Sequence, residues 1–283
     1  MKRVMLVLLL AMAVAPSAWA QSWPNEPAGS TLIGECNFNV TVCSGWVAPY
    51  GTGRSVTDAT APLSPSSVLE YSIGPGQDSG GGDVGHLVNN PGELYIGFWM
   101  KLSNPLIQPG NQLQKVFTVM SEGGQANDLL WMLIQAYPNP TGPFYPVFHL
   151  ESPYLNNSHL PGYGDPGSWI VGQNNWPGVQ ITQNVWHRIE FYLKRSFSPT
   201  SRDGIARLWM DGQLILNVTN MNWAGPLTRF HFTPAWTGWL QYDIQSTNRQ
   251  WFDHVRISAP NGGSGASKGD TTPPVAPVNL RAQ

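Results

Sequence analysis

Four polar residues, Gln135, His149, Tyr192 and Lys194, are of types that hold a carboxylate or transfer a proton. An amide can bind a carboxylate by hydrogen bonds, and His, Tyr or Lys can take or give a proton. Removal of a proton next to a carboxylate, followed by loss of an oxygen leaving group, needs this combination. We therefore predict these four as the catalytic residues if the protein is an eliminating enzyme. The sequence leaves open whether it is an enzyme.

Further polar and aromatic residues could line a carbohydrate-binding surface. Indole and phenol rings pack against the C–H faces of sugars, and polar side chains bond the hydroxyls. The long Gly-, Asn- and aromatic-rich stretch Pro161–Gly178 could form one wall of a groove. Packing in a core or against a loop is the alternative role for each tryptophan. The predicted carbohydrate-binding residues are Arg188, Glu190, Arg207, Trp209, Trp169 and Trp176.

Strand alternation predicts how several of these side chains are positioned. Residues two apart on a strand share a face, so Arg188, Glu190, Tyr192 and Lys194 form one polar stripe, expected on an open face. In the stretch LWMDGQLIL, Leu208–Leu216, the Asp-Gly pair predicts a two-residue hairpin turn. That turn directs Leu208 and Met210 inward. It therefore directs Arg207 and Trp209 outward, towards the polar stripe.

The rest of the chain predicts an all-β protein. Apolar stretches are short, turn residues are frequent, with 30 Gly and 25 Pro, and helical periodicity is nearly absent. Many strands without intervening helices favour an antiparallel two-sheet β-sandwich, a jelly roll. The predicted strands are Val68–Ile73, Glu93–Leu102, Lys115–Ser121, Leu129–Ala136, Val147–Glu151, Val185–Lys194, Gly204–Met210, Gln213–Val218, Arg229–Thr233 and Trp251–Ser258.

The two ends of the chain differ in composition from its middle. Residues 1–20 have a charged start, an apolar run and a small-residue cleavage site, which predicts a signal peptide and a secreted protein, extracellular or periplasmic, without membrane insertion after cleavage. Residues 261–283 are rich in Gly, Ser and Pro, which predicts a flexible tail. Residues 21–260 are predicted to form one domain. In this setting the close pair Cys36 and Cys43 is best explained as a disulfide.

Charge and motifs exclude several classes of function. The formal net charge is −2 at pH 7, so no basic footprint for nucleic acid is present. The sequence has no nucleophile elbow, zinc-protease motif, phosphate-binding loop or dinucleotide fingerprint. The expected partner is a polysaccharide or cell-surface glycan, and no cofactor is indicated with certainty.

The segments WHRIEFYLKR, DGIARLWMDGQLIL and WFDHVRIS, with ELYIGFWMKLS, resemble the concanavalin A-like lectin and glucanase jelly rolls, especially secreted bacterial domains related to polysaccharide lyases and laminin-G-like modules. The resemblance covers about Leu32 to Ser258 and implies the fold. Tyr192 and Lys194 are similar to the Tyr-x-Lys of alginate-lyase-type members. Many proteins of this fold hold a structural calcium, for which Asp83 and Asp253 mark candidate segments.

The same fold hosts lectins, hydrolases and lyases, so the residues must separate them. A retaining hydrolase of this fold needs paired carboxylates on a Glu-x-Asp-x-x-Glu strand, and no glutamate here has that spacing. The sequence therefore favours a secreted protein that binds a polysaccharide on the open face of one sheet. The alternatives are a lyase that cleaves a uronate-containing glycan by β-elimination, and a non-catalytic structural or adhesive surface module.

Overall fold

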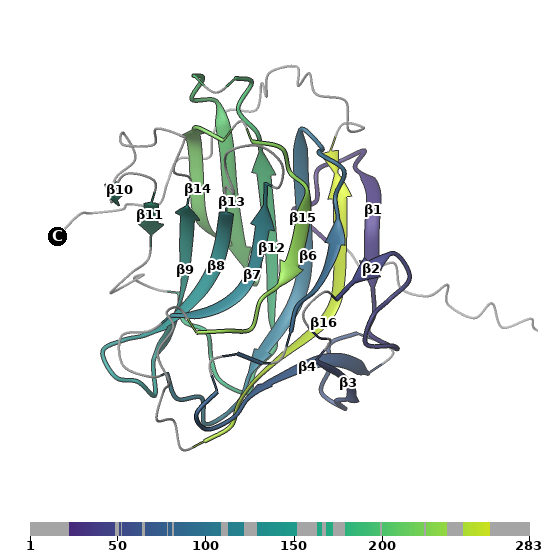
Figure 1. Ribbon diagram of the computed structural model, residues 1–283, viewed down its shortest axis with the longest axis vertical. Coiled ribbons are helices and arrows are strands. Elements are labelled where there is room, and N and C mark those ends of the chain that lie inside the picture. The colour runs from purple at the N-terminus through teal and green to yellow at the C-terminus, as the bar shows by residue number, and fades with distance from the viewer. Residues whose placement is uncertain are drawn as a thin grey trace, which may run out of the picture.

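The fold is that of a β-sandwich in which two antiparallel sheets pack face to face, as Figure 1 shows for the computed structural model. The predicted signal peptide and tail lie outside the described residues. The part of the chain that the structure describes contains no helix of the length and hydrophobicity that would cross a membrane. The described residues are 23–48, 51, 53–63, 66–77, 79–80, 82–108, 113–121, 129–151, 163–165, 168–171, 179–198, 200–223, 225–236 and 246–260.

Sheet A runs in the order β14-β13-β12-β6-β16-β4-β3, and β1 also pairs with β16. Its long central strands are those with the clearest apolar alternation in the sequence. The edges are short or irregular, as is usual for strands that present unpaired backbone groups. Its strands are β1 (Thr31–Cys36), β3 (Arg54–Thr57), β4 (Ser67–Ile73), β6 (Glu93–Leu102), β12 (His187–Lys194), β13 (Gly204–Met210), β14 (Gln213–Met221) and β16 (Asn248–Ala259).

Sheet B runs in the order β10-β11-β9-β8-β7-β15-β5-β2. The stretch Pro161–Gly178 contributes two short strands to one end of this sheet, where the sequence indicated only a loop. Its strands are β2 (Trp46–Val47), β5 (Val84–Leu87), β7 (Gln114–Met120), β8 (Leu129–Ala136), β9 (Phe144–Glu151), β10 (Tyr163–Asp165), β11 (Ser168–Val171) and β15 (Arg229–Phe232).

Aromatic side chains join the inner faces of the two sheets. The Phe232 and Phe252 rings stack with centroids 4.1 Å apart, and Phe98 meets Phe117 edge to face at 5.7 Å. Phe191 of β12 lies 5.5 Å from Phe117. All five rings are fully buried, so each contact combines apolar burial with a favourable ring geometry. These contacts fix which residues of every strand face outward.

The Asp-Gly hairpin has the predicted form. Asp211 and Gly212 have φ values of 53° and 84°, and Met210 pairs with Gln213 across a two-residue turn. Leu208 and Met210 are buried in the core, as expected. The prediction of hairpin register and facing is therefore confirmed.

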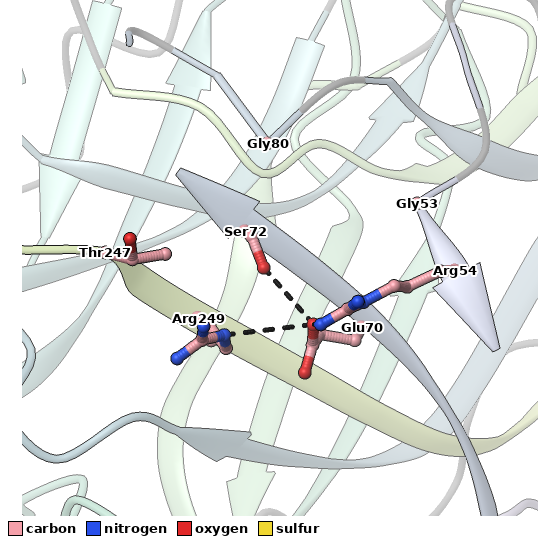
Figure 2. A pocket seen from close by; sticks show the side chains of 7 residues that line it. All are labelled: Gly53, Arg54, Glu70, Ser72, Gly80, Thr247 and Arg249. Carbon is pink, nitrogen blue, oxygen red and sulfur yellow. Dashed lines mark hydrogen bonds and ion pairs between the residues drawn. The ribbon is translucent and has the colours of Figure 1, made fainter. Parts of the chain in front are cut away.

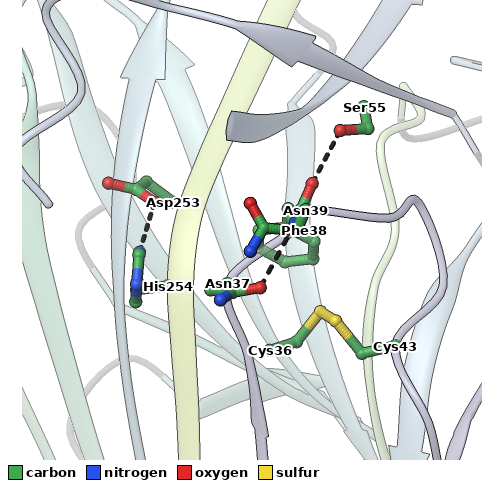
Figure 3. Close-up of a disulfide and its surroundings, with 8 residues drawn as sticks. All are labelled: Cys36, Asn37, Phe38, Asn39, Cys43, Ser55, Asp253 and His254. Atoms are coloured by element: carbon green, nitrogen blue, oxygen red, sulfur yellow. Dashed lines mark hydrogen bonds and ion pairs between the residues drawn. A yellow bond between two sulfur atoms is a disulfide. The ribbon is translucent and has the colours of Figure 1, made fainter. Parts of the chain in front are cut away.

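The predicted disulfide joins Cys36, at the end of β1, to Cys43, with a Cα–Cα distance of 5.7 Å (Figure 3). Phe38 lies inside the closed loop and is fully buried despite its positive φ of 55°. The hydroxyl of Ser55 on β3 donates to the Phe38 carbonyl at 2.6 Å (Figure 3). The disulfide therefore holds a turn that connects β1 to the β3 edge of sheet A.

Candidate active site

The outer face of sheet B gathers polar and aromatic side chains from neighbouring strands. On β8 the residues Leu130, Met132 and Ile134 are fully buried in the core, so the alternate residues of that strand point outward. Across the β8–β9 pair, Trp131 faces His149 and Gln135 faces Tyr145. Together with Lys115 of β7, these four residues are called the sheet B cluster below.

Lys115 reaches the cluster from the neighbouring strand. Its ammonium lies 4.1 Å from the centroid of the Trp131 ring, a cation–π contact. The pairing of β7 with β8 is irregular between Lys115 and Phe117. Such an irregularity changes the direction of side chains relative to a regular ladder. The contact places the positive charge of Lys115 over Trp131, which is the residue of β8 that faces His149 of β9.

His149 is held in its neutral form. It lies on β9 between the core residues Phe148 and Leu150, as the sequence indicated, with its own side chain on the outer face and half-buried. Burial, followed by repulsion from the Lys115 ammonium, lowers the pKa of His149 from its ordinary 6.5 to about 4. A neutral imidazole at pH 7 can accept a proton.

Gln135 and Tyr145 lie four residues away from Trp131 and His149 along the same two strands. The two residues are 7% and 8% exposed, and Gln180 donates to the Tyr145 hydroxyl at 3.5 Å. Between them and the Trp131–His149 pair lie Leu133 and Val147, which are buried on this outer face. The cluster therefore combines a buried amide and a buried phenol with a half-buried imidazole and a half-buried ammonium.

The four residues predicted for elimination do not form one site. Gln135 and His149 are on the outer face of sheet B, whereas Tyr192 and Lys194 are on the outer face of sheet A. Phe191, next to Tyr192 on β12, points the other way and packs against Phe117 of sheet B in the core. The two pairs therefore lie on opposite sides of the core. The Tyr192 hydroxyl instead donates to Glu93 at 2.8 Å inside sheet A.

Sequence reasoning missed Lys115, Trp131 and Tyr145. Lys115 and Trp131 lie on strands that were predicted, so their alternation was available as a signal. Tyr145 lies on the part of β9 that precedes the predicted start at Val147. The missing information was which strands are neighbours and in what register. That information is non-local and follows from the tertiary fold.

The polar stripe expected on the open face of sheet A is mostly covered. Glu190 is fully buried, and Tyr192 and Lys194 are 8% and 9% exposed. The backbone N–H and side-chain amide of Asn25 donate to Glu190 at 3.0 and 2.9 Å, and Tyr95 donates at 2.7 Å. The expectation of an open stripe is therefore wrong at Glu190, because Trp23 and Asn25 pack over this face.

Arg188 takes part in the same network from its edge. Its Nε donates to Glu190 at 3.1 Å, and its guanidinium lies 5.9 Å from the centroid of the Trp99 ring. The Arg188 side chain therefore already contacts Glu190 and Trp99 within the protein. In the same network, burial and the hydrogen bond to Glu190 raise the pKa of the Tyr95 hydroxyl.

Arg207 and Trp209 lie on the outer face of sheet A, as predicted. They pair with Tyr192 and Glu190, and both are half-buried. The Arg207 guanidinium lies 5.8 Å from the Tyr192 ring, and its Nε donates to Asn217 at 3.1 Å. Trp169 lies on β11 and pairs with Leu150, but its side chain is outside what the structure describes, as is all of Trp176.

The two calcium candidates have protein partners. Asp83 pairs with His231 at 2.7 Å. Asp253 pairs with His254 at 2.6 Å (Figure 3) and accepts the Leu63 N–H at 3.2 Å. Among the described residues, no group of three or more His, Cys, Asp or Glu side chains is placed to hold a metal ion. These contacts do not add up to a calcium site, and a structural calcium stays a prediction.

Several solved structures with a similar fold are polysaccharide lyases. An alginate lyase from Chlorella virus matches with a TM-score of 0.59 at 12% identity, over 81% of this chain and 100% of that one. The endo-β-1,4-glucuronan lyase from the fungus Trichoderma reesei matches with a TM-score of 0.55 at 17% identity, over 81% and 96%. An alginate lyase in complex with an alginate tetrasaccharide matches with a TM-score of 0.51 at 18% identity, over 75% and 86%.

The chain therefore shares the two-sheet β-sandwich fold of these solved structures. No protein-family model matches the sequence. No curated protein matches it significantly. The predicted fold class is confirmed, and the choice between binding and cleavage rests on the site itself.

Proposed function

We propose that the protein is a polysaccharide lyase that cleaves a uronate-containing glycan by β-elimination on the outer face of sheet B. The observation that carries the proposal is the pairing of β8 with β9. It places Gln135 opposite Tyr145 and Trp131 opposite the neutral His149. The lyase fold of the solved neighbours, one of them bound to alginate, supports the same substrate class.

Each group of the cluster has a role in the proposed reaction. The amide of Gln135 donates to the uronate carboxylate, and the Lys115 ammonium stabilises the negative charge that builds on it. His149 takes the proton from C5, and the electrons of that C–H bond form the C4–C5 double bond. The C4–O4 bond breaks, and the Tyr145 hydroxyl gives its proton to the leaving oxygen. Exchange with solvent then returns a proton to Tyr145 and removes one from His149.

The indole of Trp131 would serve recognition of the substrate. A flat ring next to the base can pack against the apolar face of a sugar ring. Lys115 already lies over this indole, so the cation and the ring together present a surface for an acidic sugar. The burial of Gln135 and Tyr145 strengthens the electrostatic interactions, because little water competes for the same groups.

The test is an assay of purified protein with alginate, glucuronan, pectate and glycosaminoglycans, following the ultraviolet absorbance of the unsaturated uronate product. We expect product from one or more of them. His149→Ala and Tyr145→Phe should each lower kcat/KM by about a hundredfold or more. Tyr192→Phe is the matched control, since its hydroxyl is buried on the other sheet, and it should keep nearly full activity.

Two outcomes would contradict the proposal. Retention on a glycan column without product from any substrate would reduce the function to carbohydrate recognition. Loss of activity in Tyr192→Phe, with activity kept in Tyr145→Phe and with both variants folded, would move the active site to sheet A.

A further inference from the structure

A cavity of about 450 Å³ opens on the outer face of sheet A, on the opposite side of the sandwich from the sheet B cluster. Its walls come from the edge strand β3, from its neighbour β4 and from the start of β16. Figure 2 shows Arg54, Glu70, Ser72, Thr247 and Arg249 around it. Their outward direction follows from the pairing of Arg54 with Glu70, since Leu69 and Tyr71 of β4 face the core.

Glu70 organises the polar wall of the cavity. Its carboxylate accepts from Arg54 Nε at 2.7 Å, from the Ser72 hydroxyl at 3.2 Å and from Trp251 Nε1 at 2.8 Å. The Arg54 terminal nitrogen also pairs with it. The Glu70 side chain is 7% exposed. Its bonds therefore fix the orientation of Arg54 instead of leaving a negative charge open to the cavity.

The cavity has more positive than negative charge. Arg249 Nε lies 3.8 Å from Glu70, which is ion-pair distance but too long for a hydrogen bond. The side chains of Arg54 and Arg249 are 64% and 40% exposed. Two guanidinium groups thus face the cavity with a single buried carboxylate between them. Such planar, multi-donor groups match the geometry of a carboxylate ligand.

We propose that this cavity is a second glycan-binding site, which takes the carboxylate of a uronate residue between Arg54 and Arg249. The volume falls in the range of about 300–1,000 Å³ that is common for small-ligand sites. The hydroxyls of Ser72 and Thr247 lie where they can bond the sugar hydroxyls. The site holds glycan without cleaving it, because the groups named for elimination are on the other sheet. Binding at two faces raises the effective concentration of a polymer at the protein.

The experiment uses methyl β-D-glucuronoside, which has no 4-linked leaving group and so cannot be cleaved by a lyase. Its binding is followed by NMR through the backbone amides of Gly53 and Gly80, which line the cavity. We expect saturable shifts of both signals in the unmodified protein and none with methyl β-D-glucoside. Failure of the lyase assay would leave this result unaffected, so the two proposals fail independently.

The variant Arg54→Ala/Arg249→Ala should bind the glucuronoside at least about tenfold more weakly, as expected for the loss of charged hydrogen bonds. Arg202→Ala is the matched control: it removes the same charge from an exposed residue after β12, at the other end of sheet A. Arg249→Ala alone should also weaken glucuronoside binding, and it leaves the hydrogen bonds of Glu70 in place. It therefore tests the proposal if the double variant does not fold.

Three outcomes would overturn the proposal. The first is no shift of Gly53 or Gly80 at any glucuronoside concentration. The second is equal binding by the folded arginine variants and the unmodified protein. The third is equal binding by sodium acetate or sodium sulfate, which would show a general anion site and no sugar recognition.

Discussion

The two amide groups of Asn25 close over the two carboxylate oxygens of Glu190, with donor–acceptor distances of 3.0 and 2.9 Å. Glu190 is fully buried, and Arg188 and Tyr95 supply its other bonds. A ring carbon of Trp23 lies 2.6 Å from where a Cβ on Gly97 would be, so glycine permits the close approach of this segment to β6. At Glu190, the face that looked open in the sequence is thus a packed internal contact.

Glu190→Ala should lower the free energy of unfolding by about 3 kcal/mol, since it leaves buried donors without their acceptor. Urea unfolding measures the change. Glu35→Ala is the control, because that side chain is about half exposed and should cost less than about 0.5 kcal/mol. A near-neutral Glu190→Ala would contradict the structural role given to this contact.

The low pKa of His149 predicts how activity depends on pH. With a pKa near 4, His149 stays neutral and able to accept a proton well below pH 6.5. The acid limb of kcat/KM should therefore lie near pH 4.

The same pKa shift predicts how stability depends on pH. Between pH 6.5 and 4 the unfolded chain binds a proton at His149 that the folded protein does not bind, so the free energy of unfolding falls as the pH falls. His149→Ala should lack this part of the pH dependence in thermal unfolding.

Lys115→Met tests the cause of that shift. Removing the ammonium leaves burial as the main cause, so the pKa of His149 should rise and the acid limb should move towards pH 6.5. The pH profile of kcat/KM on the active substrate is the measurement. Arg202→Met, which removes an exposed charge elsewhere, should leave the limb in place. A limb that moves in neither variant would mean that the Lys115 ammonium does not shift the titrating group.

Asp211 has a stabilising role beyond its turn. The Thr182 N–H donates to Nε2 of His187 at 3.0 Å, so a neutral His187 carries its proton on Nδ1 and donates it to Asp211 at 2.7 Å. The Arg188 N–H also donates to Asp211 at 2.8 Å. Burial raises the pKa of Asp211, but these hydrogen bonds outweigh it and the net pKa is lowered.

Asp211→Ala should therefore cost about 1–2 kcal/mol in urea unfolding at pH 7. Asp211→Asn should cost less, because Asn tolerates the positive φ and keeps an acceptor. The lowered pKa means that this stabilisation is present above pH 3.8 and is lost as the pH falls through the lower, folded value. Equal losses in both variants would contradict the contribution of the turn.

The disulfide between Cys36 and Cys43 should contribute to stability by restricting the unfolded chain. The Cys36→Ser/Cys43→Ser variant should be less stable by about 2 kcal/mol, measured by urea unfolding. Reduction of the unmodified protein should give a similar loss, whereas reduction of the double variant should change nothing. An unchanged stability on reduction would contradict the prediction.

Local patterns in the sequence determined the strands and their two faces. Every strand predicted from alternation is present, and the Asp-Gly turn directs Arg207 and Trp209 outward as expected. This succeeded because the alternation of side chains and the geometry of a two-residue turn depend on neighbouring residues alone. The strands that were not predicted are short and lie mainly at or next to the sheet edges, such as β2 and β10, where too few residues follow one another to show alternation.

The tertiary structure alone decided which faces come together. Strand order placed Lys115, Trp131 and His149 on adjacent strands, and it separated His149 from Tyr192 by the thickness of the core. It also brought Asn25 onto Glu190, across 165 positions of the chain. Alternation gives each strand two faces, but it does not say which strands are neighbours or what covers them. Those choices depend on long-range packing, and they decide where the chemistry of this protein can occur.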